Sequence, residues 1–280
     1  KKTIESVLSQ DYSHIEVLVS DNFTATPTKL ILGEVTDSRI RFITRNHRHE
    51  FSEHMNLCIH DALGHYVIII SDDDLIAPDY ISSMVRLFSE HQDVSVALGQ
   101  QKILNDTDLE LGEVETNYKT RTLEGLDFCQ SHFQGKKFVP IFTLISLFAR
   151  KEDVLSIGGF QPYSDGSHAD NYLFFSLALK GRVGISNALM GYRVYLNSFG
   201  LSTSFDNLFK ASLSYDKDMS QLVWGIDKLS VFKRLRLHLR IKISILLTLI
   251  YRLLRIYKER IGMVSTVINL LKVLVFFLPF

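Results

Sequence analysis

The sequence is poor in cysteine and contains no repeat, no low-complexity run and no signal-peptide pattern. Two cysteines among 280 residues, Cys58 and Cys129, do not form a disulfide framework, which fits a reducing compartment. Five histidines lie between His47 and His65, but they lack the spacing of structural or catalytic zinc sites. Because no initiator methionine precedes Lys1, we expect a fragment that lacks its true N-terminus.

Motifs of two other enzyme classes are also missing. No glycine-rich phosphate loop opens the chain, as a Mg²⁺-dependent nucleotidyltransferase would require, but the expected loss of the N-terminus keeps that alternative open. Ser71 to Leu75 does not supply the Asp-x-Asp-x-Thr pattern that an aspartyl phosphatase places after a strand. The sequence therefore argues against a phosphatase of that kind.

Acidic and basic residues are equal in number but unequally distributed along the chain. Residues 225–280 contain 11 Lys and Arg against 2 Asp and Glu, which leaves 20 against 29 in residues 1–224. A neutral chain with one basic and apolar end indicates a membrane surface as the partner of that end. The same distribution argues against a nucleic acid as the partner of the whole chain.

The chain is organised around residues 62–80, ALGHYVIIISDDDLIAPDY. Residues 66–70 are apolar and mostly β-branched, and they predict a strand buried on both faces. Asp72, Asp73 and Asp74 follow this strand, at the edge where open α/β sheets bind ligands. Neighbouring carboxylates repel one another, so we predict that they bind Mg²⁺ or Mn²⁺ together with a substrate diphosphate. A solvated acidic turn is the alternative.

Helical and strand patterns alternate along the first part of the chain. Periodicity predicts helices at 2–10, 28–32, 53–63 and 80–91, and strands at 15–19, 39–43, 66–70 and 94–98. Short strands are also predicted at 183–186 and 190–195. This order requires βαβ crossovers. The predicted fold class is α/β, with a mixed, largely parallel sheet flanked by helices.

Two further aspartates stand where a predicted element ends or begins. Asp21 follows the strand at 15–19, and the alternatives for it are an Asx turn and a ligand contact at the edge that carries the acidic cluster. Asp170 precedes a helix predicted at 171–180, where an N-cap is the alternative to a catalytic role. Both roles are compatible at Asp170, because a cap points into the same crevice.

Several segments over residues 1–204, in this order and spacing, resemble the family-2 glycosyltransferases with the GT-A (Rossmann-like) fold. The first helix of that family is matched by TIESVLSQDY, and its second and third strands by IEVLVSDN and RIRFITRN. The strand with the DxD-type metal motif is matched by HYVIIISDDDLIAPDYI. The acceptor-side segment with its (E/D)D pair is matched by IGGFQPYSDGSHADNYLFFSLALKG, and the next strand by GYRVY.

The resemblance implies a role for each acidic position. Asp21 would accept a hydrogen bond from the nucleotide base, Asp72 and Asp73 would bind the nucleotide sugar, and Asp73 and Asp74 would ligate a divalent metal, Mn²⁺ or Mg²⁺. Asp170, the second acid of its pair, would be the general base that deprotonates the acceptor hydroxyl. One base and one displacement imply inversion at the anomeric carbon. A metal would stabilise the charge of the departing diphosphate.

The sequence departs from the family pattern at several positions. Ser71 replaces the usual first acid of the metal motif, so the register of metal ligands across residues 72–74 stays open. Met55 and Asn56 stand where the family often has Arg-Asn, and Tyr195 stands where it often has a histidine that can ligate the metal. The first strand of the family is expected to be missing from this fragment.

The C-terminal end predicts a basic amphipathic helix. Its apolar residues step by three and four, at positions 232, 235, 239, 243, 246, 250, 253 and 257. Such a helix either lies in a membrane interface or packs onto the domain. Residues 263–280 are nearly all apolar, and as a helix they would extend about 27 Å, marginal for a hydrocarbon core of about 30 Å. Shallow insertion or pairing with a partner is therefore favoured over a full span.

These patterns predict a GT-A domain at 1–204 and a helical membrane-associating extension at 205–280, with the membrane surface bound through 228–280. The predicted function is metal-assisted, inverting transfer of a sugar from a nucleotide-diphosphate donor to a glycan or lipid-linked acceptor. The predicted location is peripheral, on the cytoplasmic, inner face of the cell membrane. A catalytically inactive membrane-associated scaffold of the same fold is the alternative from another class, because of the departures at Met55 and Tyr195.

Overall fold

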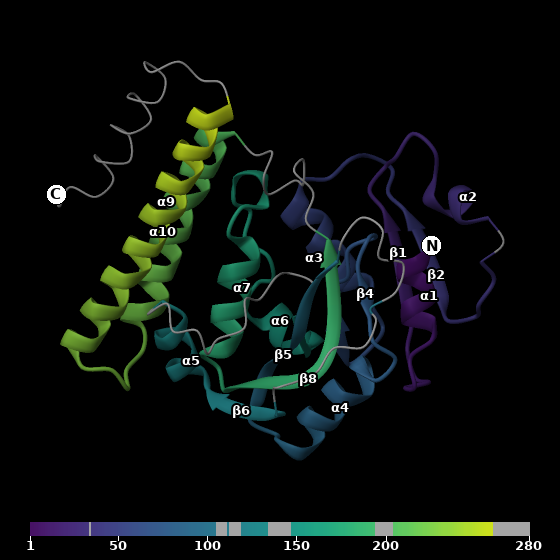
Figure 1. Cartoon of the computed structure of the whole chain (residues 1–280), viewed down its shortest axis with the longest axis horizontal. Coiled ribbons are helices and arrows are strands. Elements are labelled where there is room, and N and C mark those ends of the chain that lie inside the picture. The colour runs from purple at the N-terminus through teal and green to yellow at the C-terminus, as the bar shows by residue number, and fades with distance from the viewer. Residues whose placement is uncertain (34, 105–110, 112–118, 134–146, 194–203, 260–280) are drawn as a thin grey trace.

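The structure is a computed structural model that describes residues 1–33, 35–104, 111, 119–133, 147–193 and 204–259 (Figure 1). Its helices are α1 (Lys2–Leu8), α2 (Thr28–Leu32), α3 (Phe51–Asp61), α4 (Tyr80–Glu90), α5 (Gly125–His132), α6 (Lys151–Ser156), the 3₁₀ helix η2 (Ser164–Gly166), α7 (Ala169–Ala178), α9 (Phe205–Trp224) and α10 (Val231–Glu259). Its strands are β1 (Val17–Asp21), β2 (Ile40–Thr44), β3 (Tyr66–Ile68), β4 (Leu75–Ile76), β5 (Val94–Leu104), β6 (Arg121–Glu124), β7 (Phe148–Arg150) and β8 (Arg182–Arg193).

The strands form two sheets, which confirms the predicted mixed α/β class. β1 and β2 pair in parallel on either side of α2, as a βαβ crossover requires. The larger sheet has the order β3-β7-β5-β8-β4, with β6 also paired to β8. β5 and β8 pair in parallel, whereas β7 runs antiparallel to both β3 and β5. β3, β5 and β8 therefore share one direction.

One expected pair of strands is a single strand in the structure. The predictions at 183–186 and 190–195 correspond to β8, which is continuous from Arg182 to Arg193. The residues between the two predictions, 187–189, lie at a shift in register against β5, between Leu98 and Gln100. A bulge of this kind lets a strand continue past residues that do not fit the pairing. Tyr195, at the end of that prediction, lies outside the described residues.

Helices cover both faces of the larger sheet. Successive residues of β5 alternate between two clusters of buried side chains: Val96 and Leu98 belong to one, and Ala97 to the other. The second cluster lies under α4 and α1, and the first is formed with α5, α6, α7 and α9. A strand that is buried on both faces reads as an apolar run, and the run at 94–98 corresponds to β5, whose first six residues are buried. The run at 66–70 corresponds to β3, but β3 ends at Ile68 and is the last strand in the sheet order, and only Val67 of its three residues is fully buried, so the predicted burial on both faces is not met there.

Helix α9 packs against α7 and joins the main cluster of buried side chains. Helix α10 packs against α9, so the two form an antiparallel pair beside the sheet (Figure 1). The predicted division of the chain at residue 204 stays a prediction. Among the described residues, no helix combines the length and the apolar character that a membrane crossing needs. The apolar residues 263–280 lie outside the described part.

Candidate active site

The acidic cluster occupies the turn that joins β3 to β4. Asp74 N donates to Ser71 O at 3.3 Å, which closes the turn, and Thr3 Oγ1 of α1 donates to Asp72 O at 2.7 Å. The three side chains differ in exposure: Asp72 is exposed, Asp73 is half-buried, and Asp74 is 1% exposed. The turn therefore makes these hydrogen bonds through its backbone atoms, and its three carboxylates range from exposed to fully buried.

Asp21 lies at the end of β1 and organises the loop that follows. Its carboxylate accepts hydrogen bonds from Thr24 N at 2.8 Å and Thr28 N at 2.7 Å, and from both threonine hydroxyls. Burial raises the pKa of Asp21, but these hydrogen bonds outweigh it and lower the pKa to about 2. The Asx-turn interpretation is thus realised, and the predicted contact with a nucleotide base stays a prediction. Beside this strand end, His54 Nε2 lies 2.9 Å from Ser20 Oγ.

Helix α3 holds one side of residues 159–170, which we call the 159–170 segment. Asn56 makes a reciprocal pair of hydrogen bonds with Phe160: Nδ2 donates to Phe160 O at 2.9 Å, and Oδ1 accepts from Phe160 N at 2.8 Å. Ser52 Oγ also donates to Gln161 O at 2.6 Å. Asn56, which matches the Asn of the family's Arg-Asn pair, thus has a structural role that the sequence did not reveal.

Gly159 leaves no room for a side chain beside Asn56. Its φ is +65°, and a Cβ atom added to it would lie 2.2 Å from Asn56 Oδ1. Gly158 has a φ of +82°, but a Cβ atom there would lie 3.6 Å from Gln161 Nε2, the nearest atom. We expect Gly158→Ala to cost the left-handed backbone penalty of about 1–2 kcal/mol. Gly159→Ala should cost roughly 2 kcal/mol more, because it also displaces the Asn56 hydrogen bonds.

Urea denaturation of the two variants measures this difference in the free energy of unfolding. Gly158→Ala is the matched control, since it makes the same chemical change one residue away. Equal losses in the two variants would mean that Asn56 moves aside without cost, and that its contact does not hold the segment.

Helix α9 holds the other side of the 159–170 segment. The hydrogen-bonded pairs are Tyr163 Oη to Asp218 Oδ2 at 2.7 Å, Asn207 Nδ2 to Asp165 Oδ2 at 2.7 Å, and His168 Nε2 with Ser212 Oγ at 3.0 Å. The His168 ring also stacks on Tyr215, with the ring centroids 4.8 Å apart and an angle of 10° between the planes. The segment is therefore fixed between two helices that are distant in sequence.

Asp170 is the second residue of α7 and is half-buried. The N-cap position is occupied by His168, with a φ of +67°, so the N-cap interpretation of Asp170 is wrong. Asp170 Oδ1 accepts a hydrogen bond from Asn171 N at 2.8 Å. Burial raises the pKa of Asp170, and the backbone hydrogen bonds oppose this effect without cancelling it. A carboxylate with a raised pKa is a stronger base at neutral pH.

The start of α7, which carries Asp170, and the acidic cluster both lie toward the C-terminal side of the parallel strands of the larger sheet. Residues 179–181 join α7 to β8, so α7 runs back along the first part of β8, toward the side of the sheet where β3 and β8 end (Figure 1). β4 pairs with that end of β8, with Leu75 opposite Gly191 and Ile76 opposite Met190. Because β4 directly follows the cluster, the acidic turn lies near the C-terminal end of β8. Asp21 belongs to the other sheet, β1-β2.

The acidic cluster has the chemistry of a site for a hard cation but is not a complete cage. Within the part of the chain that the structure describes, no three His, Cys, Asp or Glu side chains are gathered as a metal site. Carboxylate oxygens are the ligands that Mg²⁺ takes, and Mg²⁺ usually keeps further positions for water and substrate phosphates. The residues therefore fit a divalent metal only as part of its ligand set.

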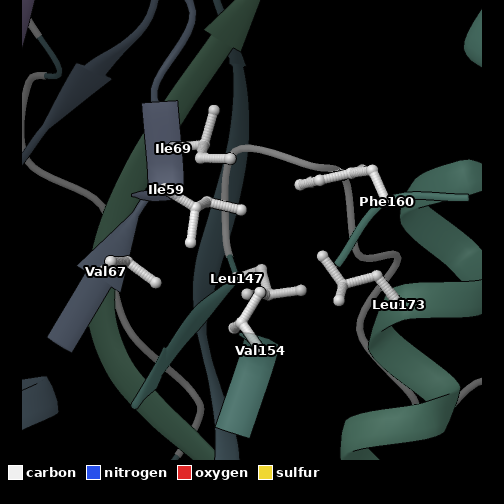
Figure 2. A pocket seen from close by; sticks show the side chains of 7 residues that line it. All are labelled: Ile59, Val67, Ile69, Leu147, Val154, Phe160 and Leu173. Carbon is white, nitrogen blue, oxygen red and sulfur yellow. The ribbon is translucent and has the colours of Figure 1, made fainter. Parts of the chain in front are cut away.

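A cavity in the core near α3 is not a substrate site. It has a volume of about 10 Å³, and its lining side chains are all apolar: Ile59, Val67, Ile69, Leu147, Val154, Phe160 and Leu173 (Figure 2). A cavity of this size has room for about one water molecule and offers that molecule no polar partner. It is a packing defect beside β3.

Known proteins resemble this chain in sequence and in fold. Residues 1–142 match the family model described as glycosyl transferase family 2. The GalNAc(5)-diNAcBac-PP-undecaprenol beta-1,3-glucosyltransferase of Campylobacter jejuni is 22% identical over 250 residues, which cover 83% of this chain and 77% of that protein.

Two solved structures share the fold. Staphylococcus aureus TarS in complex with UDP-GlcNAc superposes with a TM-score of 0.62 at 13% identity, over 85% of this chain and 66% of that one. GalNAc-T7 with UDP, GalNAc and Mn²⁺ superposes with a TM-score of 0.50 at 14% identity, over 73% of this chain and 43% of that one. The family match and this architecture agree with the sequence motifs, and the chain belongs to glycosyl transferase family 2, with the GT-A fold.

Proposed function

We propose that the chain transfers a sugar from a nucleoside-diphosphate donor to a lipid-linked glycan acceptor, with inversion at the anomeric carbon. The observation that supports this proposal is topological: α7, which carries Asp170 in its first turn, and the turn with the acidic cluster both lie toward the C-terminal side of the parallel strands. A base for the acceptor and a site for the diphosphate are the two groups that the reaction needs. The Campylobacter relative is named for an undecaprenol-linked acceptor, and TarS was solved with UDP-GlcNAc, which supports both substrate classes.

Asp170 would accept the proton of the acceptor hydroxyl. As that proton moves to an oxygen of Asp170, the acceptor oxygen bonds to the anomeric carbon and the bond from this carbon to the diphosphate breaks. A single displacement with one base inverts the configuration. The 159–170 segment is held by α3 and α9, so Asp170 is positioned before the acceptor arrives.

Asp73 and Asp74 would hold a divalent metal, and Asp72 and Asp73 would contact the donor. A bound Mn²⁺ or Mg²⁺ supplies positive charge that stabilises the departing diphosphate. The GalNAc-T7 structure contains Mn²⁺ and UDP, which supports a metal in this family of folds. Asp21 is proposed to contact the nucleotide base from a loop whose shape it already sets through Thr24 and Thr28.

The membrane is the proposed location, because a lipid-linked acceptor is confined there. We place the protein peripherally on the cytoplasmic face, with residues 228–280 as the membrane-associating part. The excess of basic over acidic residues in 225–280 supports an anionic surface as its partner.

Calorimetric titration with UDP, GDP, CDP and dTDP, each with and without Mn²⁺, tests the proposed donor site. We expect one nucleoside diphosphate to bind, and to bind more tightly when Mn²⁺ is present, because a metal held by Asp73 and Asp74 would supply positive charge for the diphosphate. The preferred base then narrows the choice of donor sugar. If none of the four binds to a protein that is folded by circular dichroism, the enzyme proposal fails and an inactive scaffold is favoured.

A further inference from the structure

Helix α10 has two apolar faces, of which one is buried. The inner face packs on α9, and its residues are 3% exposed or less: Leu237, Ile241, Ile245, Leu249 and Leu253. A second row, which we call the outer stripe, is between 45% and 84% exposed and consists of Phe232, Leu235, Leu239, Ile243, Leu247 and Tyr251. The stripe predicted from the sequence combines members of both rows, since periodicity does not tell which row meets the domain.

Polar contacts fix the rotation of α10 about its own axis. Lys242 Nζ donates to Asp216 Oδ2 of α9 at 3.1 Å, and His238 Nδ1 lies 3.2 Å from Ser220 Oγ. These contacts stand beside the inner face and cannot form if the helix turns. The outer stripe is therefore held away from the rest of the described protein.

The charged residues of α10 beside the outer stripe are all basic, and Asp227, which precedes the helix, pairs with Arg234 at 3.7 Å. From Val231 to Leu253 the helix contains no Asp or Glu. Lys233 and Arg236 are exposed and Arg240 is partly exposed, and Arg236 and Arg240 each precede a stripe residue by three positions, on the same side of the helix. An apolar row with only basic neighbours is complementary to an anionic lipid surface. A second copy of α10 would bring like charges together.

The dimensions suit a helix that lies in the membrane plane. From Phe232 to Tyr251 the outer stripe extends along about 29 Å of helix axis, and it is continuous over this length. We propose that α10 docks on an anionic membrane through the outer stripe, with Lys233, Arg236 and Arg240 at the lipid headgroups. This proposal specifies which surface of the protein meets the membrane, and it rests on the proposed function.

Docking through α10 would also place the active site relative to the membrane. α9 carries α10 on one side and holds the 159–170 segment on the other. The segment that bears Asp170 is therefore connected to the lipid-facing helix by a single rigid element. This arrangement would present the acceptor side of the site at a fixed height above the bilayer.

Flotation with vesicles tests the docking face on the full chain. Vesicles of phosphatidylcholine with phosphatidylglycerol should bind the wild type, and Leu239→Glu combined with Ile243→Glu should weaken this partition about tenfold or more. Leu155→Glu is the matched control, because Leu155 is an exposed leucine on α6, and it should leave binding unchanged. The melting temperatures of all variants should match that of the wild type, since the changed side chains are exposed.

The basic residues should act through lipid charge alone. Arg236→Gln with Arg240→Gln should reduce binding to the phosphatidylglycerol vesicles severalfold and leave the weaker binding to pure phosphatidylcholine unchanged. Equal vesicle binding by the wild type and the Leu239/Ile243 variant would overturn the proposal. The proposal would also be overturned if the wild type sedimented as a dimer and the Leu239/Ile243 variant as a monomer. Vesicle binding without nucleotide binding would instead remove the proposed transfer and leave the docking face in place.

Discussion

Asp170→Asn should reduce the turnover number about 10²–10⁴-fold, because the amide cannot accept the proton of the acceptor hydroxyl. The substitution keeps the size of the side chain and an oxygen that can accept the hydrogen bond from Asn171 N. The contacts of the segment with α3 and α9 are made by other residues, so they should persist. Donor affinity should therefore stay at the wild-type value.

Steady-state transfer and calorimetric donor titration together test this assignment. Asp79→Asn is a suitable control, since Asp79 is exposed, lies at the start of α4 and makes no side-chain cap bond. Unchanged turnover in Asp170→Asn would place the base at another residue. Loss of donor binding in the same variant would give Asp170 a role in binding rather than in proton transfer.

The same substitution should raise the melting temperature at neutral pH. Burial raises the pKa of Asp170 above its ordinary value of 3.8, so the folded state binds this proton more tightly than the unfolded state. The resulting stability is fully present below the unfolded pKa and is lost as the pH rises through the folded pKa. At pH 7 the ionised carboxylate is therefore destabilising, and the uncharged amide of the variant would remove that cost. The advantage of Asp170→Asn should shrink as the pH falls toward 3.8.

The sequence located the elements that carry chemistry because their patterns are local. The apolar run before Asp72 predicted a buried strand, and β3 and the turn after it lie there. The contacts that hold the 159–170 segment are different in kind. Tyr163 contacts Asp218 across 55 positions of sequence, and Asn56 contacts Phe160 across 104 positions. Hydrophobic periodicity does not predict either of these polar contacts. Such contacts become visible only when the fold brings the helices together.

Helix α10 illustrates a second reason why the sequence was insufficient. Its apolar residues are frequent enough to form two rows, and both rows have helical spacing. The inner row is the one that α9 covers, and the contact of Lys242 with Asp216 stands beside Ile241 and Ile245 in that arrangement. Which apolar row is buried thus depends on the surface that α9 presents, and a single sequence does not reveal that surface.

Asp73→Ala should lower the affinity for nucleoside diphosphate at saturating Mn²⁺ by at least about 100-fold, and it should remove the effect of Mn²⁺ on binding. Asp73 is the half-buried member of the cluster, so it can reach a ligand at the sheet edge and still be oriented by the turn. The melting temperature without nucleotide should change less than in Asp74→Ala, because Asp73 is only half-buried and the turn is closed by the backbone hydrogen bond from Asp74 N to Ser71 O. Calorimetry with and without Mn²⁺ measures the first effect, and thermal unfolding the second.

Asp74→Ala should distinguish a role of Asp74 in metal binding from a role in stability. It also tests which of residues 72–74 are the metal ligands, a question that Ser71 leaves open. Asp74 is 1% exposed and interacts with neighbouring groups, so its truncation should lower the melting temperature even without nucleotide or metal. Electron paramagnetic resonance of Mn²⁺ reports metal binding independently of activity, and Asp79→Ala provides the control for an exposed carboxylate nearby.

Loss of the Mn²⁺ signal in Asp73→Ala alone would make Asp73 the ligand and Asp74 a structural residue of the turn. Loss in both, with the fold of Asp74→Ala retained at the temperature of measurement, would assign both carboxylates to the metal. A signal unchanged in both variants would contradict a metal site at this turn, because each of the two proposed ligands would then be dispensable for binding the ion.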